Sequence, residues 1–229
     1  VASFTDDTVL TIAVADLILN DTDCADTIKR YAQKYQNLPY GGTFRRWFNS
    51  RASDPYYSFG NGSAMRVSPV GFAYNSVEDV LFHAKRTAEI THNHPEGIKG
   101  AQSTALAILM ARQGAEKEEI RKEIATRFEY DLDRTVAEIR PGYSFDVSCQ
   151  GSVPESIIAF LDSDSFMDAI KNAISLGGDA DTMACIAGGI AQAWYKKIPE
   201  KVVTAVREKL APDLREILDR FNETYGCEF

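Results

Sequence analysis

The chain has 229 residues, of which 45% are hydrophobic and 10% aromatic, so it is long enough to bury one large core, and no linker-like stretch divides it. Its formal net charge of −8 would repel a phosphate backbone, which argues against general binding to nucleic acid. One domain over residues 1–229 is therefore expected. The lack of an apolar run of about 18 residues argues against a membrane partner. The four widely spaced cysteines and the lack of a signal-like start predict a reducing cytoplasm.

Helical periodicity begins close to the start of the chain. Apolar residues recur at helical spacing from Val9 to Leu17, which predicts a helix that ends at Asn20. Asp6 and Asp7 fall in the first turn of this helix. The sequence therefore places two carboxylates at a helix entrance.

The next part of the chain has a different character. Between Tyr40 and Pro69 it is rich in glycine and aromatic residues, in particular from Tyr40 to Phe44 and from Ser58 to Arg66. Glycine clusters of this kind are typical of turns and loops. We expect this stretch to be the most loop-like part of the chain.

From residue 76 onward the chain is helical again, and the whole sequence predicts about ten helices and no strand, an all-α compact multi-helix fold. One segment is unusual because Ala184, Gly188 and Gly189 are small, and glycine inside a helix costs roughly 1 kcal/mol relative to alanine. We expect that helix to be buried with its neighbours packed closely. The later helical segments are 76–88, 95–109, 117–128, 163–176, 182–195, 199–210 and 212–221.

Two short acidic motifs have the residue types of a cation site. Residues 5–7 (Thr-Asp-Asp) and 179–182 (Asp-Ala-Asp-Thr) each place two carboxylates within one turn of a helix start, with threonine hydroxyls beside them. Donor sets made only of oxygen suit Mg²⁺, Mn²⁺ or Ca²⁺ far better than zinc. The two motifs therefore predict one or two divalent metal ions.

Each motif alone has a simpler interpretation. Aspartate and threonine favour helix N-termini through capping and the helix dipole, with effects of roughly 0.5 to 2 kcal/mol. Taken together, however, both motifs precede an apolar helix that must enter the core, so their carboxylates are drawn inward. Converging buried carboxylates need cations or protons, although the spacing does not itself show that the two motifs meet.

Four motifs stand in order along the chain: Phe4–Thr11 (FTDDTVLT), Gly60–Val67 (GNGSAMRV), Thr91–Ala101 (THNHPEGIKGA) and Gly177–Met183 (GGDADTM). Their sequences and order resemble the ADP-ribosylglycohydrolase family, and the helical tail beyond about Tyr195 is similar to the family's bacterial members. The resemblance implies an all-helical enzyme that uses two Mg²⁺ ions, with Mn²⁺ also effective, to cleave the glycosidic bond between ADP-ribose and an acceptor.

The resemblance also implies which residues form the metal centre. The ions would hold ribose hydroxyls and orient a water, while carboxylates assist its deprotonation. One of Asp6, Asp7 and Asp181 would act as the base. The implied metal ligands are Thr5, Asp6, Asp7, Asp179, Asp181 and Thr182.

A second group of residues is implied to line the ADP-ribose site. Gly60 lacks a Cβ, which would leave backbone N–H groups free to approach the diphosphate, and Phe59 would stack near the adenine. Without the resemblance, residues 60–62 (Gly-Asn-Gly) would be interpreted as a turn before a short helix. The implied nucleotide-binding residues are Ser58, Phe59, Gly60, Asn61 and His92.

Two further features have structural interpretations. His94 precedes Pro95 and is expected to shape a helix entrance, since no third soft ligand lies at a spacing suited to zinc. Residues Gln150–Glu155 are similar to bacterial family members, but a turn followed by proline in the first helical turn explains them without a ligand. Neither feature is assigned to the site.

Family members usually begin with a further helix that carries a Gly-Asp motif and a glutamate thought to help activate water or gate substrate. This segment is expected to be absent here, which would expose apolar surface that an oligomer could cover. The alternatives are a non-catalytic binding or structural member of the family and, ranked last, an enzyme acting on another diphosphate. The implied partner is ADP-ribose, or an ADP-ribosylated protein or small molecule, with the acceptor left open.

Overall fold

The computed structural model describes residues 3–227, and within them it confirms the all-α fold expected from the sequence. This range contains fourteen helices and, in place of a sheet, one isolated bridge between Gly60 and Ser148. None of its helices is both long and apolar enough to cross a membrane. In chain order the helices are α1 (Asp6–Asn20), α2 (Cys24–Lys34), α3 (Gly42–Asn49), α4 (Gly62–Met65), α5 (Ser68–Ala73), α6 (Val77–Glu89), α7 (Pro95–Arg112), α8 (Lys117–Phe128), α9 (Val136–Ile139), α10 (Cys149–Leu161), α11 (Phe166–Ser175), α12 (Ala180–Tyr195), α13 (Glu200–Lys209) and α14 (Pro212–Tyr225).

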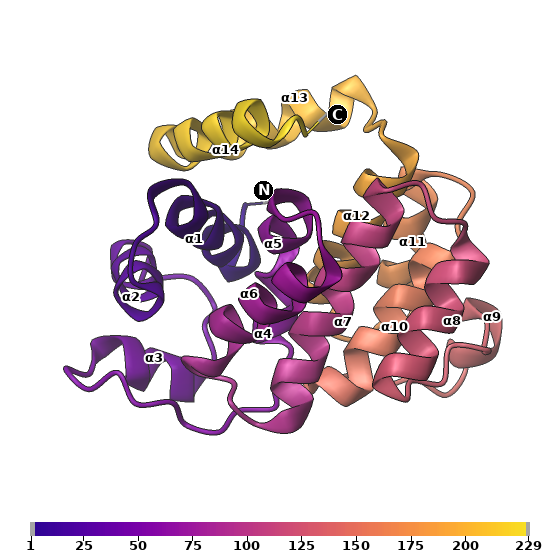
Figure 1. Cartoon of the computed structure of the whole chain (residues 1–229), viewed down its shortest axis with the longest axis horizontal. Helices are drawn as coiled ribbons and strands as arrows, with labels where there is room; N and C mark the ends of the chain where they lie inside the picture. The colour runs from indigo at the N-terminus through magenta and orange to yellow at the C-terminus, as the bar shows by residue number, and fades with distance from the viewer. Residues whose placement is uncertain (1–2, 228–229) are drawn as a thin grey trace.

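Helix α7 lies near the centre of the molecule (Figure 1) and packs against α4, α5, α6, α8, α10 and α12. Glycines let these helices approach one another closely. A Cβ added to Gly71 in α5 would lie 2.6 Å from the Cβ of Ile108 in α7. A Cβ added to Gly100 in α7 would lie 2.4 Å from the Sγ of Cys149 in α10. The spacing of the central helices is therefore set by small residues.

Helix α12 is the small-residue helix predicted from the sequence, and it packs against α7, α10 and α11. A Cβ added to Gly188 would lie 2.9 Å from the Cδ1 of Ile170 in α11. One added to Gly189 would lie 3.3 Å from the Cβ of Ser68 in α5. The prediction of a buried helix with close neighbours is confirmed.

The stretch between Tyr40 and Pro69 is less loop-like than its composition suggests, because it contains α3 and α4 and enters α5. In α3, Phe44, Trp47 and Phe48 recur at helical spacing and are buried. Their rings pack against one another and against that of Tyr40. Packing of these aromatic side chains offsets the low helix propensity of the neighbouring glycines.

The starts of α7 and α10 test two predictions. His94 is the N-cap of α7, and its Nδ1 accepts a hydrogen bond from the N–H of Glu96 at 3.1 Å, so its predicted structural role is confirmed. Ser148 is the N-cap of α10 and accepts from the N–H of Gly151 at 3.1 Å. Pro154 consequently lies inside α10, and the expectation of a proline in its first turn was wrong.

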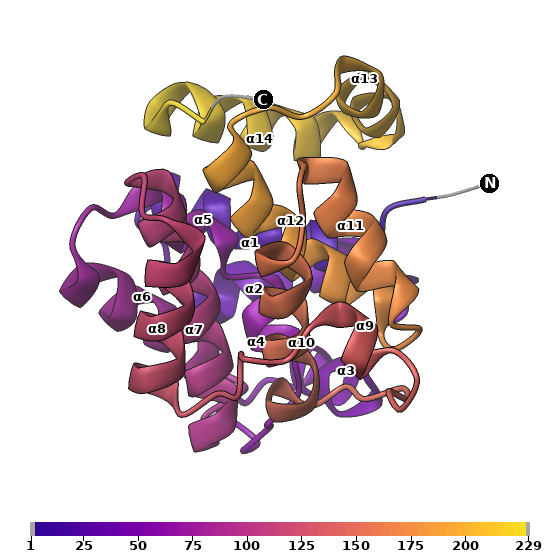
Figure 2. The same cartoon turned by 90° about the vertical axis from the view of Figure 1, so that its right-hand side faces the viewer.

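Helices α13 and α14 form a layer across one end of the helix bundle (Figures 1 and 2). Helix α14 packs on α1. Asp213 in its first turn accepts hydrogen bonds from the Nζ of Lys34 and the hydroxyl of Tyr35, both at 2.7 Å. This layer braces α1, whose first turn carries one of the acidic motifs.

Candidate active site

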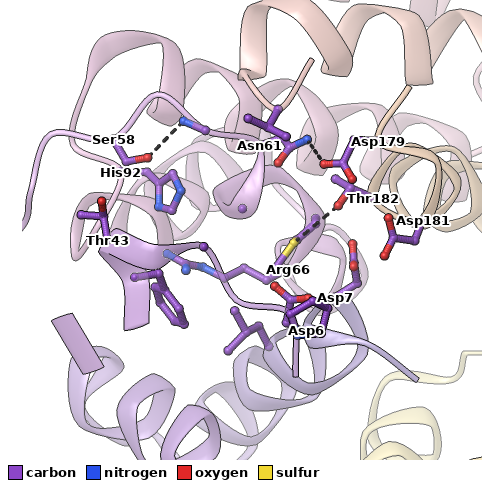
Figure 3. A pocket seen from close by; sticks show the side chains of 18 of the residues that line it. Asp6, Asp7, Thr43, Ser58, Asn61, Arg66, His92, Asp179, Asp181 and Thr182 are labelled. Carbon is purple, nitrogen blue, oxygen red and sulfur yellow. Dashed lines mark hydrogen bonds between the residues drawn. The ribbon is translucent and has the colours of Figure 1, made fainter. Parts of the chain in front are cut away.

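A pocket of about 530 Å³ opens where distant parts of the chain meet (Figure 3). Its wall is formed by the first turns of α1 and α12, the segment before α3, the glycine segment that enters α4, and the loop before α10. The structure thus brings together most of the site residues expected from the sequence. Those that line the pocket are Asp6, Asp7, Ser58, Gly60, Asn61, His92, Asp179, Asp181 and Thr182.

Two of the expected site residues do not line the pocket. Thr5 lies behind Asp7, and its hydroxyl donates to the Oδ2 of Asp7 at 2.9 Å. Phe59 is 49% exposed, and its ring contacts the edge of the His94 ring at a centroid distance of 5.5 Å. Thr5 therefore orients a carboxylate of the site, and the stacking of a base on Phe59 stays a prediction.

The acidic motifs are placed by the folding of three helices around α4. The backbone carbonyl of Met65, the last residue of α4, accepts hydrogen bonds from the hydroxyl of Thr11 in α1 at 3.1 Å and from the Sγ of Cys185 in α12 at 3.3 Å. The hydroxyl of Thr182 also contacts the Met65 sulfur at 3.9 Å. One short helix thus fixes the first turns of α1 and α12 relative to each other (Figure 3).

The glycine segment also holds one of the carboxylates directly. The side-chain amide of Asn61 donates to the Oδ2 of Asp179 at 2.8 Å and to the hydroxyl of Ser152 at 3.2 Å. Asn61 is only 6% exposed, so this amide is fixed in the pocket wall. The orientation of Asp179 is therefore determined from outside its own helix.

The carboxylates are close enough to perturb one another. Burial raises the pKa of Asp6, Asp7 and Asp179, and repulsion by neighbouring carboxylates of the two motifs raises it further. For Asp7 the pKa rises to about 6. The Oδ1 of Asp7 is buried and has no hydrogen-bond partner within the described residues. A buried acceptor without a donor indicates that this corner of the pocket is suited to a proton or a cation.

The chemistry of the donors fits a hard divalent cation, because the side chains supply carboxylate and hydroxyl oxygens without thiol or imidazole at the acidic end. The donors do not form a closed ligand shell. Across residues 3–227, no three histidine, cysteine, aspartate or glutamate side chains lie close enough together to hold an ion between them. The carboxylates converge on one pocket, but they remain separated there.

The backbone of the glycine segment differs from the expectation of free N–H groups at Gly60 and Asn61. The N–H of Gly60 donates to the hydroxyl of Ser58 at 3.1 Å, and the N–H of Asn61 donates to the carbonyl of Val147 at 2.8 Å. The Asn61 bond joins the segment to the loop before α10, beside the bridge between Gly60 and Ser148, whereas the Gly60 bond stays within the segment. The two N–H groups are therefore engaged in holding the pocket wall rather than open to a ligand.

Several pocket residues were not assigned to the site from the sequence. Arg66 is fully buried in the pocket wall, although it stands in one of the four family motifs. Phe145 is 69% exposed at the pocket rim, and Val147 lies beside it. Thr43, in the first turn of α3, also lines the pocket. The sequence signal for Arg66 was its place in the motif Gly60–Val67, and the signal for Phe145 was an aromatic residue between polar neighbours.

Comparisons with known proteins agree with the all-α fold. A sequence profile described as ADP-ribosylglycohydrolase matches residues 1–228. The chain is 30% identical to "ADP-ribosylhydrolase ARH3" of Homo sapiens, over 86% of this chain and 72% of that protein. It is 29% identical to "ADP-ribosylarginine hydrolase Tri1" of Pseudomonas putida, over 59% of this chain and 38% of that protein. A solved structure titled "ADP-ribosylglycohydrolase-related protein complex" superimposes with a TM-score of 0.75 at 25% identity, covering 99% of this chain and 82% of that one.

Proposed function

The chain belongs to the ADP-ribosylglycohydrolase family, a family of hydrolases, and we propose that it cleaves the glycosidic bond joining ADP-ribose to an acceptor, with the aid of two Mg²⁺ ions. The observation that carries this proposal is the meeting of two acidic helix starts in one pocket. The volume of about 530 Å³ also falls within the range of roughly 300 to 1,000 Å³ that small-molecule sites span. The names of the relatives in mouse and human support the same class of bond.

Oxygen donors support Mg²⁺ as the resident ion, and Mn²⁺ would serve in the same shell. When bound, the ions would orient the ribose hydroxyls and a water at the glycosidic carbon. Because the acidic side chains remain separated in the pocket, we expect ion binding to draw the carboxylates of α1 and α12 together. The residues that would hold the ions are Thr5, Asp6, Asp7, Asp179, Asp181 and Thr182.

The chain's own residues would supply the proton transfer and the positioning. Asp7 is a buried carboxyl whose Oδ1 has no hydrogen-bond donor within residues 3–227, so this oxygen could accept a proton from a water in the pocket. Asp6 and Asp181 line the same pocket and are the other candidates for this role. Asn61 would keep Asp179 in its orientation throughout the reaction, because its amide is fixed on both sides.

Isothermal titration of ADP-ribose tests the binding half of the proposal. We expect binding in the presence of Mg²⁺ and its loss after chelation with EDTA, because an acidic pocket repels a diphosphate unless cations are bound. Binding that is equally strong in EDTA would refute the metal-dependent site. No binding by a folded protein under either condition would refute ADP-ribose as the ligand.

Turnover separates the hydrolase from a non-catalytic member of the family. Peptides ADP-ribosylated on arginine or serine are incubated with the protein, and release of ADP-ribose is followed by chromatography. Asp6→Asn and Asp181→Asn should each reduce turnover by at least about 100-fold. Asp26→Asn is the matched control, since it is an exposed acid in the first turn of α2. Metal-dependent binding without turnover of any ADP-ribosyl substrate would favour the non-catalytic alternative.

A further inference from the structure

Arg66 is a fully buried cation in the pocket wall that has no carboxylate partner within residues 3–227. Its Nη2 donates to the backbone carbonyl of Thr87 at 2.6 Å and to the hydroxyl of Thr91 at 2.8 Å. Its Nε and Nη1 are buried without a partner. A buried guanidinium is expensive to desolvate, so its retention here needs a reason beyond packing.

The Thr91 hydroxyl connects Arg66 to His92. Its oxygen accepts from the guanidinium of Arg66 and lies 2.7 Å from the Nδ1 of His92. Thr91 is 0% exposed, so its single hydroxyl hydrogen needs an acceptor inside the protein. Nδ1 lies within hydrogen-bond distance of it, and the Tyr56 hydroxyl, which also interacts with Thr91, can donate to the second lone pair of the same oxygen. Hence Thr91 donates to Nδ1, and the ring proton of His92 must sit on Nε2.

His92 is also held neutral. It is 6% exposed, and burial lowers its pKa well below the ordinary value, with the charge of Arg66 lowering it further. A second cation beside a buried guanidinium would be strongly unfavourable. The imidazole therefore keeps one proton at neutral pH.

The Nε2 side of the ring faces the glycine segment of the pocket. A Cβ added to Gly62 would lie 3.1 Å from Nε2, and one added to Gly60 would lie 3.6 Å away. Nε2 makes no hydrogen bond within the described residues, and His92 lines the pocket (Figure 3). The glycines thus leave room beside a donor that has no protein acceptor.

We propose that Arg66 and Thr91 are positioning residues that hold His92 with its proton on Nε2, so that the pocket contains a fixed hydrogen-bond donor for an oxygen of the ligand. Arg66 acts through Thr91, which it supplies with a hydrogen bond so that the hydroxyl must donate onward. An oxygen of the sugar or diphosphate can accept from Nε2, whereas a ligand group that only donates cannot. The identity of the ligand rests on the function proposed above, but the tautomer does not.

The first test reads the tautomer without any ligand. Long-range ¹⁵N–¹H NMR correlations of ¹⁵N-histidine-labelled protein distinguish protonated from unprotonated ring nitrogens, and only three histidines need assignment. We expect an unprotonated Nδ1 and a protonated Nε2 for His92 at pH 7. A protonated Nδ1, or a rapid mixture of both tautomers, would overturn the proposal. Because this experiment contains no ADP-ribose, its result does not depend on whether the proposed function is correct.

The second test breaks the hydrogen-bond relay from Arg66 through Thr91 to His92. Thr91→Val should allow His92 to populate both neutral tautomers. It should also weaken binding of ADP-ribose in the presence of Mg²⁺ by about tenfold, the effect of losing one fixed hydrogen bond. Thr91→Ser should restore both readouts. Thr87→Val is the matched control, because Thr87 is equally buried and its hydroxyl donates to Ala84 rather than to Thr91. If Thr91→Val keeps the His92 tautomer of the wild type, or if Thr87→Val shifts it equally, the relay is wrong.

Discussion

At the scale of single residues, the acidic motifs trade stability for function. Asp7 is buried, its Oδ1 has no hydrogen-bond donor, and its pKa is raised to about 6. A group whose pKa is raised in the folded state makes folding less favourable once the pH exceeds its ordinary value. Buried carboxyl groups whose ionised form is destabilised in this way are typical of functional sites.

The pH dependence of unfolding should reveal this trade-off. The folded protein binds the Asp7 proton more tightly than the unfolded chain does, so the stability of the EDTA-treated protein should fall as the pH rises from about 4 to 6. Asp7→Asn should therefore be more stable than the wild type by about 3 kcal/mol at pH 7.5 and by little at pH 4. Urea unfolding at both pH values measures the difference. An equal difference at the two pH values would contradict it.

The contact between Gly62 and His92 makes a second prediction at this scale. A methyl group at residue 62 would lie 3.1 Å from Nε2 and 3.3 Å from Cε1 of His92, which is tight enough to push the ring. Gly62→Ala should therefore weaken ADP-ribose binding several-fold, measured by titration in Mg²⁺. Gly142→Ala is the control, because its added methyl would meet nothing within 4 Å. Unchanged binding by Gly62→Ala would show that the ring position does not matter.

At the scale of elements, the helical period predicted most of the long helices, whereas α3 was missed within the stretch that we expected to be loop-like. Helix α12 was recognised because its small residues imply burial against close neighbours. Helix α4 has four residues, too few for a period, and depends on hydrogen bonds to Met65 from Thr11 and Cys185. Helix α3 forms because its aromatic side chains pack together, which outweighs its glycines. Tertiary contacts of this kind are not visible in a local sequence pattern.

The contact between α7 and α10 gives a prediction for this scale. Gly100→Ala would bring a methyl group within 2.4 Å of the Sγ and 2.9 Å of the Cβ of Cys149, so the helices must move apart. We expect a loss of about 1 to 3 kcal/mol in unfolding free energy, measured by urea denaturation. Adding Cys149→Ala should recover part of the loss, because it removes the sulfur. A neutral Gly100→Ala would mean that the two helices adjust freely.

At the scale of the whole molecule, the site is assembled from residues far apart in the chain. The sequence predicted two acidic helix starts, but only the fold shows that Asp7 and Asp179 line one pocket. It also could not predict that Asn61 holds Asp179, because that bond depends on how α4 packs against α12. The residue types of a site can thus be read locally, whereas their meeting is a property of the complete fold.

Ion binding should therefore stabilise the whole fold. Mg²⁺ at about 100 times its Kd would add about 2.7 kcal/mol, which corresponds to a rise in Tm of roughly 5 to 10 °C for a chain of this size. Thermal unfolding with and without Mg²⁺ measures this shift. Asp181→Asn should lose most of the shift, while Asp26→Asn should keep it. A wild-type Tm that does not change when Mg²⁺ is added would argue against the proposed metal centre.

The fixed amide of Asn61 also bears on how the protein ages. Asn61 is followed by Gly62, and an asparagine before glycine is prone to deamidation, in which the next backbone nitrogen attacks the side-chain carbonyl and ammonia leaves. Here the amide nitrogen is bound to Asp179 and Ser152, and the backbone of Asn61 is helical, which keeps that attack from its required geometry. Once unfolded, the same pair would be free to react, and refolding would then set a new carboxylate against Asp179. A stored preparation would lose its site through chemistry that the native fold holds back.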